Sequence, residues 1–228
     1  MKQYKRIVLV VPVIVFLALA LIVVSAILLR NSRNRGEGAY QRAELKVLLR
    51  GNEHLLGVAT APVKIVEYAE AECIYCKRLH PVLLRVVDEN EGNVALVYRH
   101  FPLSIHPKSF NEAIALECAA EAGGNSFFWS YLETLYEATP SNNKIDLAIL
   151  PELAQTVGIP KEVFNECLTS DRHEARVRDD IESGFVLDVD SVPQLFVTAP
   201  NGKVFVFRKS PSYAVLNATV LAALELTN

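Results

Sequence analysis

Two cysteines separated by two residues, Cys73 and Cys76, are the side chains of this sequence whose type and spacing most directly indicate chemistry. A thiolate attacks a disulfide through a mixed disulfide, so a redox catalyst needs one reactive thiol and a second thiol that resolves the intermediate. The pair follows an apolar run at residues 63–68 and precedes apolar residues at helical spacing. The pattern predicts a buried strand that leads directly into a helix beginning at the dithiol.

The expected helix distinguishes the two thiols. Cys73 lies at its N-terminus, where unpaired N–H groups and the positive end of the helix dipole favour a thiolate. Cys76 lies one turn further on and can close a disulfide with Cys73. Glu70 and Glu72 are expected to raise the pKa of Cys73, and the two basic residues after Cys76 oppose them.

The same pair has two other interpretations, a structural disulfide and half of a zinc site. A structural zinc site needs a second pair of ligands at close spacing. The other two cysteines, Cys118 and Cys167, stand alone in the sequence. We therefore expect no metal at the pair, and no bound cofactor.

Five motifs follow one another along the chain: APVKIVEYAEAECIYCKRLHP at residues 61–81, VYRHFPLSIHP at 97–107, AIALECAAEAGGNSFFWSYLETLYE at 113–137, FNECLTSDRHEARV at 164–177, and Val192–Pro193 before QLFV. In this order they resemble the DsbA-like branch of the thioredoxin-fold thiol–disulfide oxidoreductases. The resemblance covers roughly residues 52–208 and is far more specific than a lone Cys-x-x-C. It implies an α/β, thioredoxin-like fold with an all-helical insertion, and catalysis by Cys73 and Cys76.

The resemblance also implies roles for other residues. Glu67 lies within the apolar strand, where a carboxylate is costly without a function or a partner. In the family the acid at this position moves a proton for the resolving cysteine; a paired structural carboxylate is the alternative. Val192–Pro193 resembles the cis-proline turn that faces the dithiol and binds substrate, although Ser-Val-Pro replaces the usual Gly-Thr-Pro. Cys118 and Cys167 are expected to form a structural disulfide, the alternative being two buried thiols.

The first 35 residues predict a membrane segment. Residues 7–29 are an uncharged apolar run of 23 residues, which as a helix would span about 34 Å and cross a bilayer core. This run exceeds a typical signal-peptide core, so we predict an N-terminal transmembrane helix over a cleaved signal peptide. Basic residues on both sides leave the orientation open. Because the cysteine chemistry needs an oxidising compartment, we expect the catalytic domain in the periplasm or another extracytoplasmic space.

The predicted organisation is an anchor with its flanks at 1–35, a tether at 36–57 and a thioredoxin-like domain at 58–228, with the helical insertion at about 108–187. Two helices are expected at 110–122 and 126–138, a hairpin joins 194–199 to 203–208, and Ser210 is expected to cap the last helix. Residues 36–228 hold 17 basic and 26 acidic side chains, a formal net charge of −9. This balance argues against a nucleic-acid partner.

The function that the resemblance implies is a membrane-anchored oxidoreductase that introduces disulfides into secreted proteins. Its partners would be reduced or unfolded secreted proteins and an integral membrane quinone-linked protein that reoxidises the dithiol. The same site could work as a reductase or isomerase, because the reduction potential sets the direction. A binding module without turnover is a further alternative, but it would not need the dithiol, Glu67 and Val192–Pro193 together.

Overall fold

The structure is a computed structural model that describes residue 25 and residues 49–226 of the 228-residue chain. The chain divides into two compact units, residues 1–43 and residues 44–228. The predicted transmembrane segment lies, except for Ser25, outside the described residues. Among the described residues, no helix combines the length and the apolar character that a membrane crossing requires.

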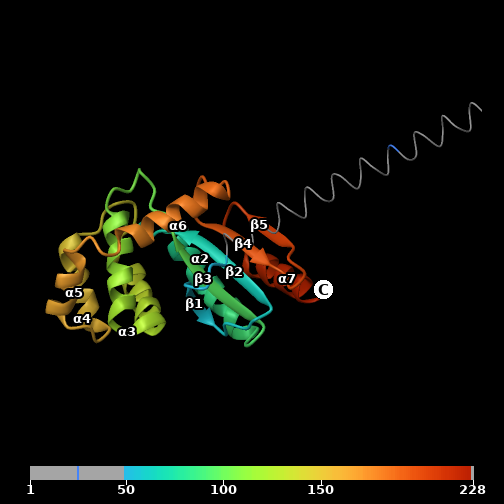
Figure 1. The fold of residues 1–228 in the computed structure, drawn as a ribbon, viewed down its shortest axis with the longest axis horizontal. Coiled ribbons are helices and arrows are strands. Elements are labelled where there is room, and N and C mark those ends of the chain that lie inside the picture. The colour runs from blue at the N-terminus through green and yellow to red at the C-terminus, as the bar shows by residue number, and fades with distance from the viewer. Residues whose placement is uncertain (1–24, 26–48, 227–228) are drawn as a thin grey trace, which may run out of the picture. The chain divides into compact units, whose positions relative to one another are not determined.

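A five-stranded sheet forms the centre of the second unit, with the strand order β1-β3-β2-β4-β5 (Figure 1). The strands are β1 (His54–Gly57), β2 (Val63–Ala69), β3 (Val94–His100), β4 (Gln194–Thr198) and β5 (Val204–Phe207). β2 and β3 are parallel and are joined by helix α2 (Ile74–Glu89), whereas the other neighbouring pairs are antiparallel. β2, β3 and β4 are buried along nearly their whole length, which explains their almost continuous apolar sequences.

Helices cover both faces of the sheet, and successive side chains of β2 point to opposite faces. Ile65 points to the face covered by α2 and α7 (Tyr213–Leu224), in a core that also contains Leu83 and Leu216. Val66 points to the opposite face, in a smaller core beside helix α6 (Glu174–Val186) that includes Phe196. Glu67 has the parity of Ile65, so the fold directs it toward α2 and the dithiol.

The remaining helices form the insertion between β3 and β4. They are α3 (Ser109–Ala138), the 3-10 turn η1 (Leu147–Ile149), α4 (Leu150–Thr156), α5 (Lys161–Leu168) and α6. In Figure 1, α3, α4 and α5 gather at one end of this unit, away from β5 and α7. The two helices predicted at 110–122 and 126–138 are joined as α3 across a kink at Gly123 and Gly124. Gly124 has a φ of 69°, a conformation that glycine adopts without a steric penalty.

Two boundaries differ from the sequence prediction. The segment predicted as a tether reaches into the sheet, because its last four residues form β1 and pair with β3. The last helix is capped by Ser212 and not by Ser210, because the Ser212 hydroxyl accepts a hydrogen bond from the Val215 N–H at 3.4 Å. The helical insertion itself extends from α3 at residue 109 to α6 at residue 186, close to the predicted range.

Candidate active site

Cys73 occupies the N-cap position of α2, where the chain turns from β2 into the helix. Its sulfur accepts a hydrogen bond from the Cys76 main-chain N–H at 3.3 Å. The pKa of Cys73 is lowered, first by a hydrogen bond from the Cys76 thiol and then by the N–H groups of Cys76 and Tyr75, against the opposing effect of burial. The helix start therefore stabilises a Cys73 thiolate, the nucleophilic form of the side chain.

Cys76 lies one turn inside α2 and is fully buried. Burial raises its pKa well above the usual range, and the hydrogen bond to Cys73 raises it further. The two thiols are not bonded to each other in this structure, which therefore represents the reduced dithiol. Of the two thiols, Cys76 therefore holds its proton more tightly.

Glu67 lies beneath the dithiol with an exposed fraction of 0%. Neither of its carboxylate oxygens has a hydrogen-bond partner among the described residues. Burial, followed by the negative charge of Cys73, raises the pKa of Glu67 to about 8, and the charge of Glu67 in turn raises the pKa of Cys76. A carboxyl group that is poised near neutral pH beside a buried thiol can exchange a proton with it.

Val192 and Pro193, the predicted substrate-binding turn, face the dithiol. Their peptide bond is cis, and the Val192 carbonyl oxygen lies 3.6 Å from the Cys73 sulfur. A cavity of about 490 Å³ adjoins this turn, and Tyr75 from within the Cys-x-x-C lines its other side. The structure thus brings together the predicted catalytic dithiol, Glu67 and the turn, from segments more than 100 residues apart in sequence.

The family described as thioredoxin matches residues 50–220 of this sequence. The chain belongs to this thioredoxin family. Among curated proteins, "Probable disulfide bond formation protein D" of Bacillus anthracis is 28% identical over 151 residues, which are 62% of this chain and 68% of that protein. Its likeness points to the branch of the family that exchanges thiols and disulfides.

Two other curated relatives are proteins named Na(+)/H(+) antiporter NhaA 1. Those of Mycobacterium sp. (strain KMS) and Mycolicibacterium gilvum (strain PYR-GCK) are 31% and 32% identical to this chain over 154 residues, or 66% of it. The matched region is only 24% of the length of each antiporter. This thioredoxin-family chain therefore resembles one part of those longer proteins.

Solved structures show the same relationship at the level of the fold. DsbA2 of Pseudomonas aeruginosa is 25% identical, with a TM-score of 0.63 over 77% of this chain and 93% of that chain. BdbD of Bacillus subtilis, 22% identical, has a TM-score of 0.68 over 78% and 95% of the two chains, which shows a shared fold. With the family match, these likenesses make the chain a thiol–disulfide oxidoreductase of the DsbA type.

Three ionisable side chains near the dithiol were not predicted from the sequence: Tyr98, Tyr136 and His80. The register of β2 with β3 places Tyr98 beside Glu67, and the rings of Tyr136 and His80 are 5.2 Å apart between centroids. None of their polar atoms has a well-aligned hydrogen-bond partner among the described residues. Burial raises the pKa of both tyrosines and lowers that of His80 to about 4. Pairing the two predicted strands would have located Tyr98, but no sequence pattern indicates the other two.

The acidic residues just before the dithiol are bound by other groups. Glu70 pairs with His106 and accepts a hydrogen bond from the Leu103 N–H at 2.8 Å. Glu72 accepts hydrogen bonds from the main-chain N–H groups of residues 143–145. Of the two, Glu70 does raise the pKa of Cys73 through its charge, as its position in the sequence predicts, but this effect is smaller than those of burial and of the hydrogen bonds to the Cys73 sulfur. Through these contacts the two carboxylates connect the loop before α2 to residues 103–106 and 143–145.

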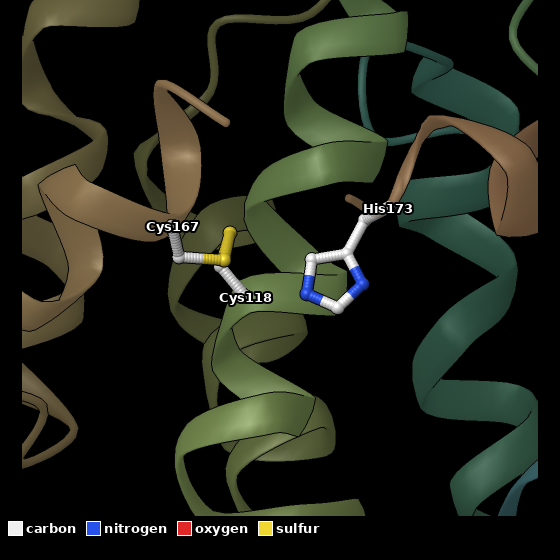
Figure 2. Close-up of side chains that lie close together, drawn as sticks. All are labelled: Cys118, Cys167 and His173. Atoms are coloured by element: carbon white, nitrogen blue, oxygen red, sulfur yellow. A yellow bond between two sulfur atoms is a disulfide. The ribbon is translucent and has the colours of Figure 1, made fainter. Parts of the chain in front are cut away.

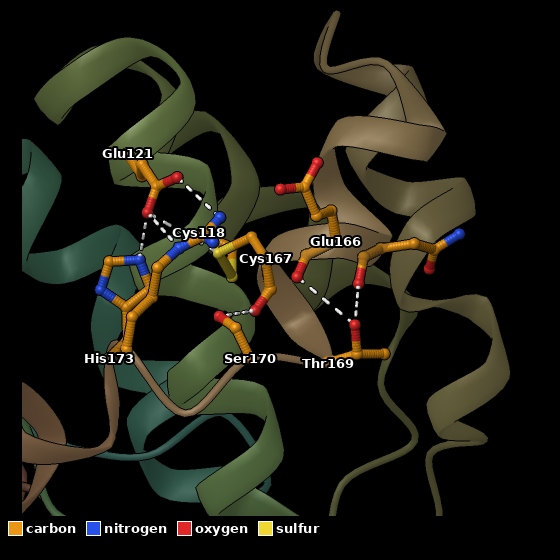
Figure 3. The surroundings of a disulfide bond; sticks show 9 residues. Cys118, Glu121, Glu166, Cys167, Thr169, Ser170 and His173 are labelled. Carbon is orange, nitrogen blue, oxygen red and sulfur yellow. Dashed lines mark hydrogen bonds and ion pairs between the residues drawn. A yellow bond between two sulfur atoms is a disulfide. The ribbon is translucent and has the colours of Figure 1, made fainter.

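Cys118 of α3 and Cys167 of α5 form a disulfide within the helical insertion, with their Cα atoms 5.7 Å apart. Figure 2 shows the His173 ring beside this bond. In Figure 3, His173 contacts Glu121, at 2.7 Å between Nε2 and Oε2. The bond covalently joins two helices of the insertion and leaves the dithiol as the only free pair among the four cysteines.

At two places among the described residues, side chains of the types that bind metal ions lie close together, and neither group includes the dithiol. In the first group, Cys118 and Cys167 have no thiolate to offer, because their sulfurs are bonded to each other. In the second, Glu117 Oε1 lies 2.7 Å from His54 Nε2 and 2.9 Å from His100 Nε2. These are hydrogen-bond distances, so the second group is a buried carboxylate–imidazole cluster.

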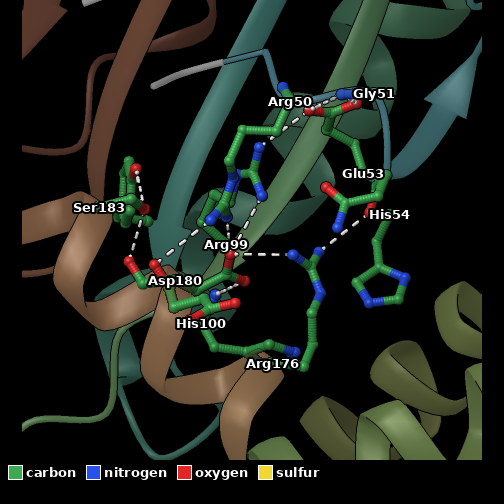
Figure 4. Close-up of polar contacts among 12 residues, drawn as sticks. Arg50, Gly51, Glu53, His54, Arg99, His100, Arg176, Asp180 and Ser183 are labelled. Carbon is green, nitrogen blue, oxygen red and sulfur yellow. Dashed lines mark hydrogen bonds and ion pairs between the residues drawn. The ribbon is translucent and has the colours of Figure 1, made fainter. Parts of the chain in front are cut away.

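Arg99 is the centre of a buried ionic network on the α6 face of the sheet, shown in Figure 4. Its guanidinium group lies 3.0 Å from Asp180 Oδ1 and 2.9 Å from Glu53 Oε1. Asp180 also pairs with Arg50 and Arg176, and its second oxygen accepts the main-chain N–H of residue 100 at 3.1 Å. The network connects α6 and the residues before β1 to the C-terminal end of β3.

Proposed function

We propose that the chain is a membrane-anchored enzyme that introduces disulfides into extracytoplasmic proteins through Cys73 and Cys76. The observation that carries this proposal is the opposite effect of the fold on the two thiols: the pKa of Cys73 is lowered and that of Cys76 is raised. A stabilised thiolate favours the reduced dithiol over the disulfide. The disulfide form is then a stronger oxidant toward client thiols.

In this mechanism a client thiolate attacks the Cys73 sulfur of the oxidised enzyme. The Cys73–Cys76 bond breaks, a bond between Cys73 and the client sulfur forms, and Cys76 takes the proton held by Glu67. A second client thiolate then attacks the client sulfur of the mixed disulfide and releases Cys73 as a thiolate. The client loses two electrons and the enzyme gains them.

The reduced dithiol must be reoxidised before another turnover. An integral membrane quinone-linked protein would accept the two electrons, and an anchor at residues 7–29 would hold the domain near it. The clients would be reduced or unfolded secreted proteins. Ion antiport is not part of this proposal, because the chain matches only 24% of the length of the antiporter relatives.

The reduction potential of the full chain tests the direction of the reaction. Equilibration with glutathione buffers, followed by quantification of the two forms, should give a potential above about −220 mV. A potential at or below that of thioredoxin, about −270 mV, would indicate a reductase and contradict the proposal.

Fractionation tests the anchor and the compartment. The intact chain should be recovered with membranes, and protease added from the outer side should degrade the domain. A soluble species that begins near residue 27 would instead identify the apolar run as a cleaved signal peptide.

A further inference from the structure

The cavity beside the dithiol carries two basic side chains that the exchange chemistry does not use. Its lining consists of Tyr75, Ser191, Val192, Pro193, Arg208, Lys209 and Ser210. Arg208 and Lys209 come directly after β5, whose last residue is paired with the second residue of β4. Continuing this antiparallel register places Arg208 opposite Gln194 and Lys209 opposite Pro193. The hairpin therefore brings positive charge to the place where a client segment would lie.

Both basic groups are available to a ligand. Arg208 and Lys209 are exposed. Arg208 donates to the Asp188 carbonyl oxygen at 2.9 Å, and neither side chain forms an ion pair with a described residue. Asp190 stands near the rim, where its carboxylate accepts a hydrogen bond from the Ser191 hydroxyl at 2.9 Å. None of the residues lining the cavity is acidic.

The other carboxylates near the dithiol do not neutralise this charge. Glu70 and Glu72 are buried and bound to His106 and to main-chain N–H groups, as described above. Glu67 is enclosed beneath the dithiol and is largely protonated at neutral pH, because burial raises its pKa to about 8. The charges that face the cavity are therefore mainly positive, although residues 36–228 as a whole carry a formal net charge of −9.

The same wall offers main-chain groups to an extended peptide. The Val192 carbonyl oxygen lies 3.6 Å from the Cys73 sulfur. The Val192 N–H donates to no acceptor among the residues that the structure describes. A client strand that pairs with this turn would present its cysteine to Cys73 and its neighbouring side chains to Arg208 and Lys209.

We propose that this groove selects client segments that carry an acidic side chain close to the reacting cysteine, through ion pairs with Arg208 and Lys209. The inference rests on the proposed exchange chemistry at Cys73 and specifies its clients. Exposed ion pairs contribute modestly, so each is expected to change the rate of capture by about two- to fivefold. Because the domain as a whole repels anions, such a preference would have to arise locally in the groove.

A single exchange step can test the preference without full turnover. The full chain with Cys76→Ala is mixed with peptides whose one cysteine carries a neutral thiopyridyl group through a disulfide. The Cys73 thiolate attacks the peptide sulfur, a Cys73–peptide disulfide forms, and the peptide–thiopyridyl bond breaks to release pyridinethione, which takes up a proton. The peptides differ only at the residues flanking the cysteine, which are Asp, Asn or Lys.

The Asp peptides should react about three- to tenfold faster than the Asn peptides at low salt, and the Lys peptides more slowly than both. The difference should vanish near 1 M salt, where the screening length is about 3 Å. Adding Arg208→Gln and Lys209→Gln should make the Asp and Asn rates equal. Lys203→Gln is the matched control, since Lys203 lies in the turn at the other end of the same hairpin and should leave the ratio unchanged.

Equal Asp and Asn rates in the Cys76→Ala chain would overturn the inference, and so would a preference that survives both groove substitutions. The proposed oxidase function has its own readout, the oxidation of reduced two-cysteine Asn peptides by the unmodified chain. Failure of that reaction together with an intact Asp preference would reject the oxidase role and leave the groove selectivity standing. Successful oxidation without an Asp preference would do the reverse.

Discussion

Two groups of buried ionisable side chains, one on each face of the sheet, differ in whether they have partners. On the face toward α6, Arg99 and Asp180 are fully buried and each has charged partners at hydrogen-bond distance. On the face toward α2, Glu67 and Tyr98 are equally buried, yet their oxygens have no well-aligned hydrogen-bond partner among the described residues. Both groups lie on the central strands β2 and β3 or pack against them, so the contrast does not come from depth.

This contrast distinguishes the buried groups that maintain the fold from those that the fold retains for chemistry. Breaking an ion pair in a protein interior is strongly destabilising, whereas a buried ionisable group without a partner lowers the stability of the folded state. Glu67 lies next to the dithiol, which needs a proton acceptor and donor. We therefore interpret the unpaired group around Glu67 as functional and the paired network around Arg99 as structural.

The largest expected effect distinguishes the two thiols that lie beside the unpaired group. Cys73→Ala should abolish exchange, because Cys76 is buried and its raised pKa keeps it protonated. Cys76→Ala should still attack clients and should accumulate mixed disulfides, which non-reducing gels of the trapped complexes would show. Client trapping through Cys76 in the Cys73→Ala chain would reverse the assignment.

In the paired network, Asp180→Asn should cost about 3–5 kcal/mol of the free energy of unfolding, because it removes the buried carboxylate charge that Arg50, Arg99 and Arg176 share. Urea unfolding of the reduced chain measures this loss, and the alkylation rate of Cys73 in the folded protein should not change. The matched control is Glu174→Gln, which removes an exposed ion pair with Arg178 and should cost at most about 0.5 kcal/mol. Equal costs for the two substitutions would remove the distinction between the two groups.

Glu67→Gln should stabilise the reduced protein. Since the folded pKa of Glu67 is about 8 and the usual value is 4.5, the unfolded chain releases this proton first and stability falls as pH rises from 4.5 to 8. The substitution removes that loss and should raise the free energy of unfolding by up to about 3 kcal/mol at pH 7. Urea titrations at pH 5 and pH 8 test this; a variant less stable than the parent at both would mean that Glu67 has a stabilising partner.

The smallest of these effects concerns His80, whose pKa burial lowers to about 4 from 6.5. The unfolded chain gains this proton below pH 6.5 while the folded chain does not, so stability falls as pH drops from 6.5 toward 4. His80→Leu removes that loss and should stabilise the protein by about 2 kcal/mol more at pH 5 than at pH 7. Thermal unfolding at the two pH values measures the difference, and an equal shift at both would indicate that packing alone is responsible.

The sequence predicts the parts of this molecule that depend on local patterns. The Cys-x-x-C after an apolar strand predicts the attacking position of Cys73, and the family motifs imply the thioredoxin-like fold, the helical insertion and Glu67. Helix ends and short edge strands are less certain from sequence. β1 has only four residues and is defined by its pairing with β3, so the sequence alone predicts that its segment belongs to a tether.

The residues that sequence reasoning missed are placed by contacts between distant segments. Tyr136 approaches the dithiol from α3, about 60 residues away along the chain, and Arg208 reaches the groove from the end of β5. Arg99 and Asp180 are 81 residues apart. No local sequence pattern predicts these contacts, because they depend on how α3 and α6 cross the sheet.

The rate at which Cys76 resolves a preformed Cys73–peptide disulfide, measured against pH, tests the functional interpretation of the unpaired group around Glu67 most directly. In the unmodified chain the rate should rise with pH as Glu67 ionises with a midpoint near 8, because the Glu67 carboxylate accepts the Cys76 proton. Glu67→Gln should keep the first attack by Cys73 but resolve about 10²-fold or more slowly, and should lose this midpoint. Identical resolution rates and pH profiles in the two proteins would contradict the proton-transfer role and leave Glu67 as a buried carboxyl group without a function.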